Sequence, residues 1–173
     1  SYPASAFAYG FRGTPLLVQL WIVYYGIGSL GEEGLGTPLW ILFRDPWLVG
    51  LLVLILNTSA YASEILRGGL VNVSKGQMDA AVTVGMSWLQ AMRRIMLPQA
   101  IRIAWPAYGN EIILLMKGSA LVSTITVMDL MGQTRTVFAR SFDLEIYAYA
   151  ALLYLILAGV LTFTLSRLER LWR

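Results

Sequence analysis

Four stretches of the chain are long and apolar enough to cross a membrane as helices. They extend over about Ala4–Leu30, Trp47–Leu66, Ile101–Val122 and Ile146–Leu165. A spanning helix needs about 20 mainly apolar residues. The second and fourth stretches are strong by hydropathy alone, whereas polar residues interrupt the third, which should therefore face protein or a water-filled cavity. The pattern predicts an all-α integral membrane protein, a multi-span helical bundle that forms one transmembrane domain over residues 1–173.

The connection between the second and third stretches, about residues 67–100, has a different pattern. Ser74 and Gln77 match a capping box, in which the serine side chain caps the helix and the glutamine reaches back to it. They predict a short helix over about Lys75–Val84. It should stop at Gly85, because glycine tolerates the left-handed conformation of a helix stop.

A second capping box opens the next short helix of this connection. Ser87 and Gln90 form it, and the helix should end near Leu97 because Pro98 follows. Its apolar residues form one stripe, and its polar residues occupy the other side: Trp88, Leu89, Met92, Ile95 and Met96 against Gln90, Arg93 and Arg94. This amphipathic pattern fits helices that lie under the lipid headgroups, and it fits equally an element that docks a partner protein.

The distribution of charge orients the spans. Residues 67–102 carry five basic side chains and one acidic side chain, a net charge of +4, and the tail holds Arg167, Arg170 and Arg173 against Glu169. Residues 31–46 carry one basic and three acidic side chains, and residues 123–145 are mildly acidic. Positively charged segments remain on the cytoplasmic side. We therefore expect the amphipathic connection and the C-terminus to be cytoplasmic.

Composition supports the membrane interpretation and excludes several classes of chemistry. The chain is 57% hydrophobic and 13% charged, against about a quarter charged residues in soluble domains. It has neither cysteine nor histidine, which argues against disulfides, thiol nucleophiles, imidazole bases and a metal site. We attribute the sequence pI near 9.3 to membrane topology and expect no nucleic-acid partner.

Nucleotide motifs are also absent. The chain has no phosphate-binding G-x-x-x-x-G-K-[ST] sequence, so a transporter of this kind would draw its energy from another subunit. Gly26–Gly31 matches G-x-G-x-x-G but lacks the strand that a dinucleotide site requires. We therefore expect no cofactor and no enzymatic activity. Because Ser1 opens within an apolar stretch, we expect a fragment that lacks its natural N-terminus and at least one further span.

Ionisable and amide side chains inside the spans are candidates for a translocation path. Glu111 lies about ten residues into the third stretch, where a charge is costly in lipid. We hypothesise that Glu111 and Asn110, with Asn57 and Thr58 from the second stretch, line the path and meet the amino or guanidinium end of a polar substrate. The alternative, with similar weight, is that Glu111 and Asn110 bind neighbouring spans or a partner subunit.

Two further expectations concern charges near the predicted cytoplasmic side. Glu64 should lie at the interface or pair with Arg67 or Arg102. Pro15 should kink the first span, because proline removes a backbone hydrogen bond. Arg12 beside that kink should extend towards the cytoplasm.

Several motifs together resemble one transporter family. Asp79-Ala80-Ala81, Gly85 and Ile95-Met96-Leu97-Pro98 resemble the EAA motif of the membrane subunits of bacterial ABC importers. The sequences FRGTPLLVQL (11–20), NTSAY (57–61) and PAYGNE (106–111) resemble the polar amino acid permeases, such as those for histidine, arginine, glutamine and opines. The resemblance covers nearly the whole chain, with its motifs in order around the predicted spans.

In that family the EAA segment forms a coupling helix that sits in a groove of the ATP-hydrolysing subunit. The resemblance implies the same docking role for residues of the connection: Asp79, Ala80, Ala81, Gly85, Ile95, Leu97 and Pro98. One departure is Asp79, where the motif usually has glutamate. Aspartate keeps the charge but is one methylene shorter, so we expect docking to survive with a re-aimed contact.

The resemblance implies a permease subunit of the bacterial inner membrane that imports polar amino acids or opines by alternating access. Its implied partners are two ATPase subunits, a second permease subunit (a copy or a paralogue) and an extracytoplasmic binding protein. The alternatives are a self-contained channel or ion-driven carrier, and a structural scaffold. Glu64, Glu111 and Lys117 are too few to form an ion relay, which disfavours the carrier. A structural scaffold would not explain why the connection over residues 67–100 contains two capped helices.

Overall fold

The computed structural model describes residues 2–172, and every regular element in that range is helical. Arg173, part of the predicted positive tail, lies outside the described residues. The elements are α1 (Tyr2–Gly13), α2 (Leu16–Trp21), a π-helical turn η1 (Ile22–Ile27), a 3₁₀ turn η2 (Gly28–Leu30), α3 (Gly31–Leu35), α4 (Thr37–Arg44), α5 (Pro46–Val71), α6 (Lys75–Thr83), α7 (Trp88–Ala91), a π-helical turn η3 (Met92–Met96), α8 (Leu97–Gly118), a 3₁₀ turn η4 (Ser119–Ile125), α9 (Leu130–Ser141) and α10 (Glu145–Trp172).

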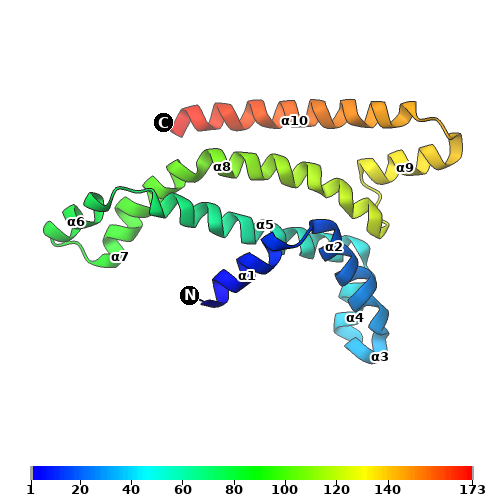
Figure 1. Cartoon of the computed structure of the whole chain (residues 1–173), viewed down its shortest axis with the longest axis horizontal. Helices are drawn as coiled ribbons and strands as arrows, with labels where there is room; N and C mark the ends of the chain where they lie inside the picture. Colours follow the sequence, from blue (N-terminus) through cyan, green and yellow to red (C-terminus); the bar gives the residue numbers. More distant parts are fainter. Residues whose placement is uncertain (1, 173) are drawn as a thin grey trace.

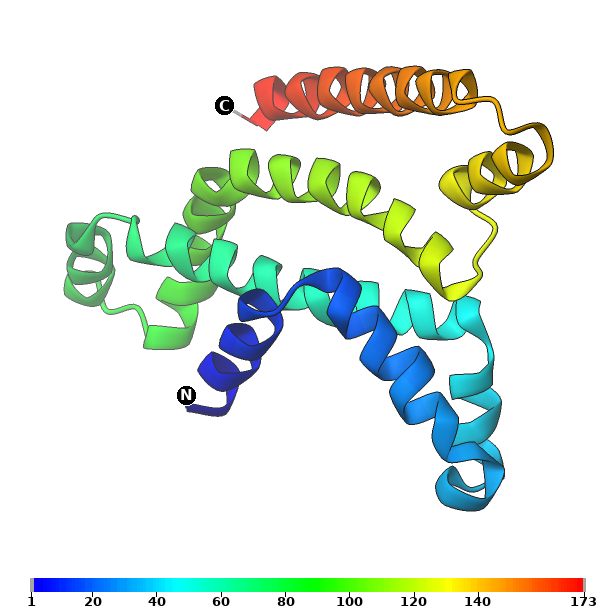
Figure 2. The same ribbon diagram turned by 45° about the vertical axis from the view of Figure 1, so that its right-hand side comes forward.

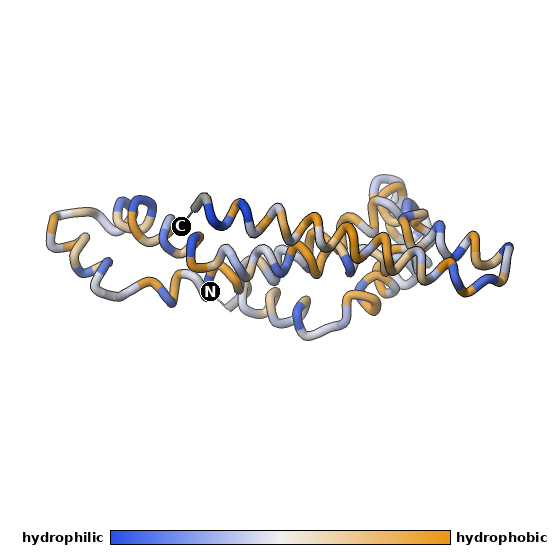
Figure 3. Tube along the Cα trace, turned by 90° about the horizontal axis from the view of Figure 1, so that it is seen from above, coloured by the Kyte–Doolittle hydropathy of each residue, from blue (hydrophilic) through white to orange (hydrophobic). Residues whose placement is uncertain are grey.

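Three long helices dominate the molecule: α5, α8 and α10 run side by side, with α6 and α7 at one end and α3, α4 and α9 towards the other (Figure 1). Two of the described helices are long and apolar enough to cross a membrane, Pro46–Val71 and Glu145–Arg170. A third candidate arises if Trp88–Ile125 and Leu130–Ser141, which meet at a 48° bend, count as one span. Apolar residues concentrate along the middle of the long helices and polar residues towards their ends (Figure 3).

Helix α5 extends beyond the predicted stretch at its C-terminal end. Its start is fixed by Asp45, whose carboxylate accepts hydrogen bonds from the backbone of Trp47 (2.8 Å) and Leu48 (3.4 Å). Pro46 occupies the first helical position, where its missing N–H costs nothing. The aspartate is thus a helix cap, and its charge suits the positive end of the helix dipole.

Helices α5 and α8 are antiparallel and approach most closely where the side chains are smallest. A methyl group added at Gly69 would lie 2.5 Å from the carbonyl oxygen of Ala100 and 3.1 Å from the Cβ of Ala104. Further along, the hydroxyl of Tyr108 donates to the carbonyl of Ala62 (3.1 Å). Small residues that allow close backbone approach are the usual means by which membrane helices associate.

The opposite end of α5 carries the apolar core. Its buried members come from α2, α5, η4 and the second residue after the η4 turn: Leu20, Val49, Val53, Val122, Ile125 and Val127. Thr124 reinforces this junction, because Trp21 Nε1 donates to its hydroxyl (3.1 Å) and the Tyr25 hydroxyl donates to its carbonyl (3.0 Å). The core therefore fastens α2 and η4 to the start of α5.

The predicted first stretch, residues 4–30, is divided into several elements. Helix α1 ends at Gly13, Thr14 and Pro15 are non-helical, and α2 begins at Leu16. Figure 2 shows the change of direction between α1 and α2. The predicted kink is thus a complete break, and the assignment of 4–30 as a span stays a prediction. The predicted loops 31–46 and 123–145 also contain short helices, α3, α4 and α9.

Two local predictions for the connection were wrong. The side chain of Ser74 makes no capping hydrogen bond, and only its carbonyl accepts from the Gln77 backbone (3.0 Å). The second short helix does not end at Leu97, because α7 continues through η3 into α8. Pro98 lies in the first turn of α8, where a missing N–H is tolerated, and the π turn before it resets the hydrogen-bond register.

Candidate functional site

The connecting segment, defined here as residues 74–96, is a helix–turn–helix unit at one end of the long helices (Figure 1). Gly85 ends the first part with a backbone φ of 78°, as predicted. The predicted capping box at Ser87 is also confirmed: the Gln90 backbone donates to the Ser87 hydroxyl (3.3 Å), and the Ser87 backbone donates to the Gln90 side chain (3.0 Å). Local hydrogen bonds therefore hold the turn in one conformation.

Part of the connecting segment packs internally, with α6 against α7 and η3. Ala81 is 1% exposed and Ala91 is fully buried. The backbone of Met86 donates to the carbonyl of Ala81 (3.0 Å), and this hydrogen bond closes the turn that contains Gly85. Ile95 and Leu97 are half-buried where the segment joins α8. Ala81 is thus a packing residue of the segment and not part of its accessible surface.

Four large apolar side chains of the segment, which we call the exposed tip, are each at least 60% exposed: Val82, Val84, Trp88 and Leu89. Asp79, Ala80 and Gly85 are exposed as well, and so is Pro98. The four lie within residues 82–89, on either side of the Gly85 turn, and exposed apolar residues close together indicate an interaction surface. The predicted docking residues therefore divide into an exposed set and a buried or half-buried set that supports it.

A pair of amides fastens the break between α1 and α2. Pro15 has no N–H, so the carbonyl of Phe11 four residues earlier loses its helical partner. The side chain of Gln19 takes that place, with Nε2 2.7 Å from the Phe11 oxygen and 3.0 Å from the Thr14 oxygen. Asn57 Nδ2 on α5 donates to Gln19 Oε1 (3.0 Å). We call Gln19 and Asn57 the amide clasp.

Gln19 was not predicted from the sequence, although the sequence contains a signal for its role. The proline predicts an orphaned carbonyl, and Gln19 is the nearest following residue with an amide donor. Asn57, which was predicted to line a path, donates a hydrogen bond to Gln19, and its place in a path stays a prediction. Thr58 beside it is half-buried, and its hydroxyl has no hydrogen-bond partner among the described residues.

The two polar neighbours on α8 point to different sides. Asn110 is exposed and lines a groove of about 210 Å³ between α8 and α10, together with Thr162 and Ser166. Glu111 is 8% exposed. It follows Tyr108 by one turn and so lies on the face of α8 that packs on α5. Asn110 and Glu111 therefore face different surroundings, and the assignment of the four residues to one path stays a prediction.

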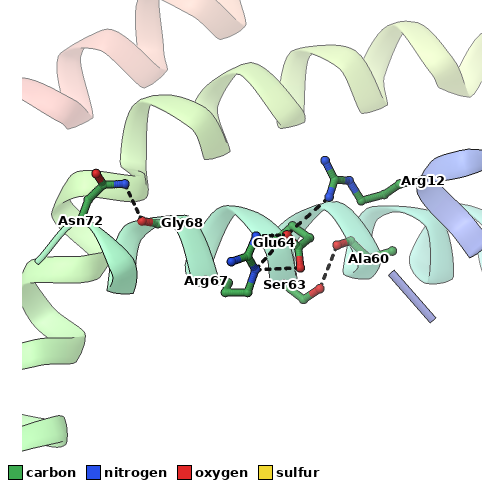
Figure 4. Close-up of polar contacts among 7 residues, drawn as sticks. All are labelled: Arg12, Ala60, Ser63, Glu64, Arg67, Gly68 and Asn72. Atoms are coloured by element: carbon green, nitrogen blue, oxygen red, sulfur yellow. Dashed lines mark hydrogen bonds and ion pairs between the residues drawn. The ribbon is translucent and has the colours of Figure 1, made fainter. Parts of the chain in front are cut away.

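Charged residues of α1 and α5 form a cluster (Figure 4). Glu64 accepts from Arg67 at 2.7 to 3.0 Å through three N–O contacts, which confirms one of the predicted pairings. Arg12 reaches across from α1, with Nη1 3.5 Å from Glu64 Oε2. Its guanidinium also lies over the Tyr61 ring, 5.4 Å from the centroid. Arg12 therefore contacts α5 while 43% of its side chain is exposed, and its extension towards the cytoplasm stays a prediction.

Comparison with known proteins decides the family. Residues 2–171 match the family described as binding-protein-dependent transport system inner membrane component. The chain belongs to this family. It is 45% identical to the nopaline transport system permease protein NocM of Agrobacterium fabrum over 176 residues, 96% of this chain and 70% of that protein. It is 40% identical to the arginine ABC transporter permease protein ArtM of Haemophilus influenzae, over 92% of this chain and 70% of that protein.

A solved structure shows the same fold. The chain superposes on the crystal structure of an amino acid ABC transporter with histidines with a TM-score of 0.83, at 35% identity, over 96% of this chain and 73% of that one. The permease is accordingly an all-helical inner-membrane transport component and not an enzyme. Its relatives are permease subunits of ABC importers, which favours the ATP-driven importer over the self-contained channel or carrier.

Membership of this family implies partner proteins, and the permease has a surface at each end that such partners could use. The family description itself states dependence on a binding protein, and an ABC importer includes an ATPase. The permease has exposed apolar surface at one end of its long helices and short helices, α3, α4 and α9, towards the other. Each end thus offers a separate surface.

Proposed function

We propose that the permease imports polar amino acids or opines, driven by an ATPase that docks on the exposed tip of the connecting segment. The observation that carries the proposal is the tip itself: four large apolar side chains, each at least 60% exposed, on a capped and internally packed unit. The names of the relatives, which include nopaline, octopine and arginine permeases, support the substrate class.

In this proposal the docking residues have two roles. Asp79, Ala80 and Gly85 lie at the surface and contact the ATPase together with the exposed tip. Ala81 packs inside the segment, and Ile95 and Leu97 lie where η3 continues into α8, so that movement of the docked ATPase is transmitted to the long helix. Pro98, which is exposed in the first turn of α8, marks the start of that helix.

The orientation follows from charge. The connecting segment carries Arg93 and Arg94, and the C-terminal end of α10 lies towards the same end of the molecule (Figure 1). Both would be cytoplasmic, because positive segments remain inside. The end with α3, α4 and α9 would then meet the binding protein. A second permease subunit, a copy or a paralogue, would complete the path, and alternating access would move the substrate.

Glu111 is the residue that we place in the path, with Thr58 and Asn110 as accessory polar groups. Its carboxylate is suited to the amino or guanidinium group of a substrate. Asn57 contributes through the amide clasp. In reconstituted vesicles, Glu111→Gln should reduce uptake of L-arginine more than uptake of L-glutamine. Unchanged uptake and preference would remove Glu111 from the path.

The docking proposal can be tested with the full-length permease, its ATPase and its binding protein in proteoliposomes. The double variant Trp88→Ala and Leu89→Ala should lower ATPase co-purification and ATP-driven uptake by about tenfold or more, since a buried aromatic anchor at an interface contributes about 2 kcal/mol. Leu144→Ala removes an equally exposed apolar side chain before α10 and should leave the ATPase bound. Full ATPase binding by the double variant would contradict the proposal.

A further inference from the structure

Two carboxylates on neighbouring helices, Glu64 on α5 and Glu111 on α8, differ in whether they have a cationic partner. Glu64 is already neutralised by Arg67, with N–O distances of 2.7 to 3.0 Å. The contact from Arg12 to Glu64 is longer, 3.5 Å, and the Arg12 side chain is 43% exposed. Figure 4 shows both arginines directed at the same glutamate. Glu64 therefore has a sufficient partner without Arg12.

Glu111 is in the opposite situation. It is 8% exposed, and among the described residues it makes no hydrogen bond or ion pair. A carboxylate inside a membrane helix is costly, and pairing with a cation reduces that cost. Glu111 therefore needs a cation that Glu64 does not need.

Arg12 is positioned to supply it. Tyr108 donates to Ala62 on the antiparallel helix α5, and Glu111 follows Tyr108 by one turn, which brings Glu111 level with the turn of α5 that contains Tyr61. Arg12 lies over the ring of Tyr61, which belongs to that turn of α5. Lys117, six residues further along α8, is about 240° around the helix from Glu111 and is exposed.

We propose that Arg12 alternates between Glu64 and Glu111 and serves as a tethered placeholder for the cationic end of the substrate. This rests on the proposed function, in which Glu111 meets that cationic end. Arg12 neutralises Glu111 when no substrate is bound, and it returns to Glu64 when the substrate's amino or guanidinium group takes its place. Arg67 keeps Glu64 paired in both states, so neither Glu64 nor Glu111 is left without a cation.

The backbone beside Arg12 is held by hydrogen bonds, so the proposed exchange is a movement of the side chain. Phe11, the residue before Arg12, has its carbonyl held by Gln19, and Asn57 anchors Gln19 to α5. The amide clasp thus fixes the α1 backbone, while the long arginine side chain can rotate. Because a substrate must displace a guanidinium to reach Glu111, Arg12 becomes a residue that determines specificity.

The pairing with Glu111 can be measured without any substrate. The full-length permease with its ATPase is placed in nanodiscs, and melting temperatures are compared for wild type, Arg12→Gln, Glu111→Gln and the double variant. Arg12→Gln should lower the melting temperature by roughly 2–4 °C more when Glu111 is present than when Gln replaces it. Arg12→Lys should retain most of this coupling. Additive effects of the two substitutions would overturn the proposal.

The displacement is tested by repeating this cycle at saturating L-arginine, octopine or nopaline, with the probe that wild type transports. Substrate should abolish the coupling between Arg12 and Glu111, and Arg12→Gln should lower the half-saturating concentration of that substrate several-fold. Coupling that persists with substrate would indicate a fixed ion pair and would overturn the proposal. The proposed path fails separately, if Glu111→Gln leaves uptake and preference unchanged.

Discussion

At the scale of single residues, the contact between α5 and α8 depends on the absence of one methyl group. Gly69 is buried against the Ala100 carbonyl, whereas a methyl group at Gly68 would have no heavy atom within 4 Å. Gly69 thus lies in a tight helix contact, whereas the adjacent Gly68 has open space beside it. The proximity of Gly69 to Ala100 explains how α8 can follow α5 so closely beside the connecting segment.

This difference gives a matched pair of substitutions. Gly69→Ala should destabilise the permease by about 1–3 kcal/mol, because the helices must separate to admit the methyl group. Gly68→Ala should be neutral or slightly stabilising, since alanine favours helix. The melting temperatures of the two purified variants provide the measurement. An equal response of both variants would show that the close contact is not important for stability.

Ionic partners were predictable only where they are near in sequence. Glu64 and Arg67 are three residues apart on one helix, a spacing that brings side chains together. Arg12 and Glu64 are joined by the tertiary fold, so hydropathy and charge counting could not reveal their contact. The burial of Ala81 beside the exposed Ala80 has the same origin, because it depends on how α6 lies against the rest of the segment.

At the scale of elements, helix ends were predicted best where the side chain itself supplies the cap. The capping boxes at Ser74 and Ser87 are equivalent in sequence, yet only Ser87 caps through its side chain. The sequence pattern shows which capping hydrogen bonds are possible, but the backbone conformation at the start of the helix decides whether they form. Pro98 was expected to end the preceding helix, but it lies in the first turn of α8.

The two serines therefore provide a test of the connecting segment. Ser87→Ala should weaken the start of α7 by about 1 kcal/mol, within a usual range of 0.5–2 kcal/mol. Faster amide hydrogen exchange over residues 88–91 should accompany it, with partial loss of uptake. Ser74→Ala removes a hydroxyl that makes no cap and should change neither property. A larger effect at Ser74 would contradict the hydrogen bonding described here.

The amide clasp predicts an interaction between two residues at the α1–α2 break. Gln19→Leu should destabilise the permease by about 1–3 kcal/mol, because the Phe11 and Thr14 carbonyls and the Asn57 amide lose a partner. Pro15→Ala supplies an N–H that can bond to the Phe11 carbonyl. Gln19→Leu should therefore cost less in the Pro15→Ala background, as measured by thermal unfolding. The same cost in both backgrounds would show that the clasp does not replace the missing bond.

At the scale of the whole molecule, hydropathy identified α5 and α10, because their continuous apolar runs need no tertiary information. The first stretch was apolar enough to predict a span, but Pro15 and the π turn divide it. The helices α3, α4 and α9 are short and were hidden within segments that looked like loops. The function was indicated by a local motif, the connecting segment, together with the family resemblance.

The central claim is that an ATPase docks on the connecting segment, and a disulfide test addresses it most directly. This chain has no cysteine, so Ala80→Cys places a single thiol on it, beside the exposed tip. The full-length permease is co-expressed with an ATPase that carries one cysteine in its docking groove. Ala81→Cys is the control, because that residue is 1% exposed.

We predict a crosslink from position 80 whose yield changes with ATP, and little or none from position 81. Such a result would place the exposed tip at the interface through which ATP hydrolysis drives transport. No crosslink from position 80, with both proteins folded and present in the membrane, would contradict the account. The connecting segment would then be an amphipathic unit that lies at the membrane surface.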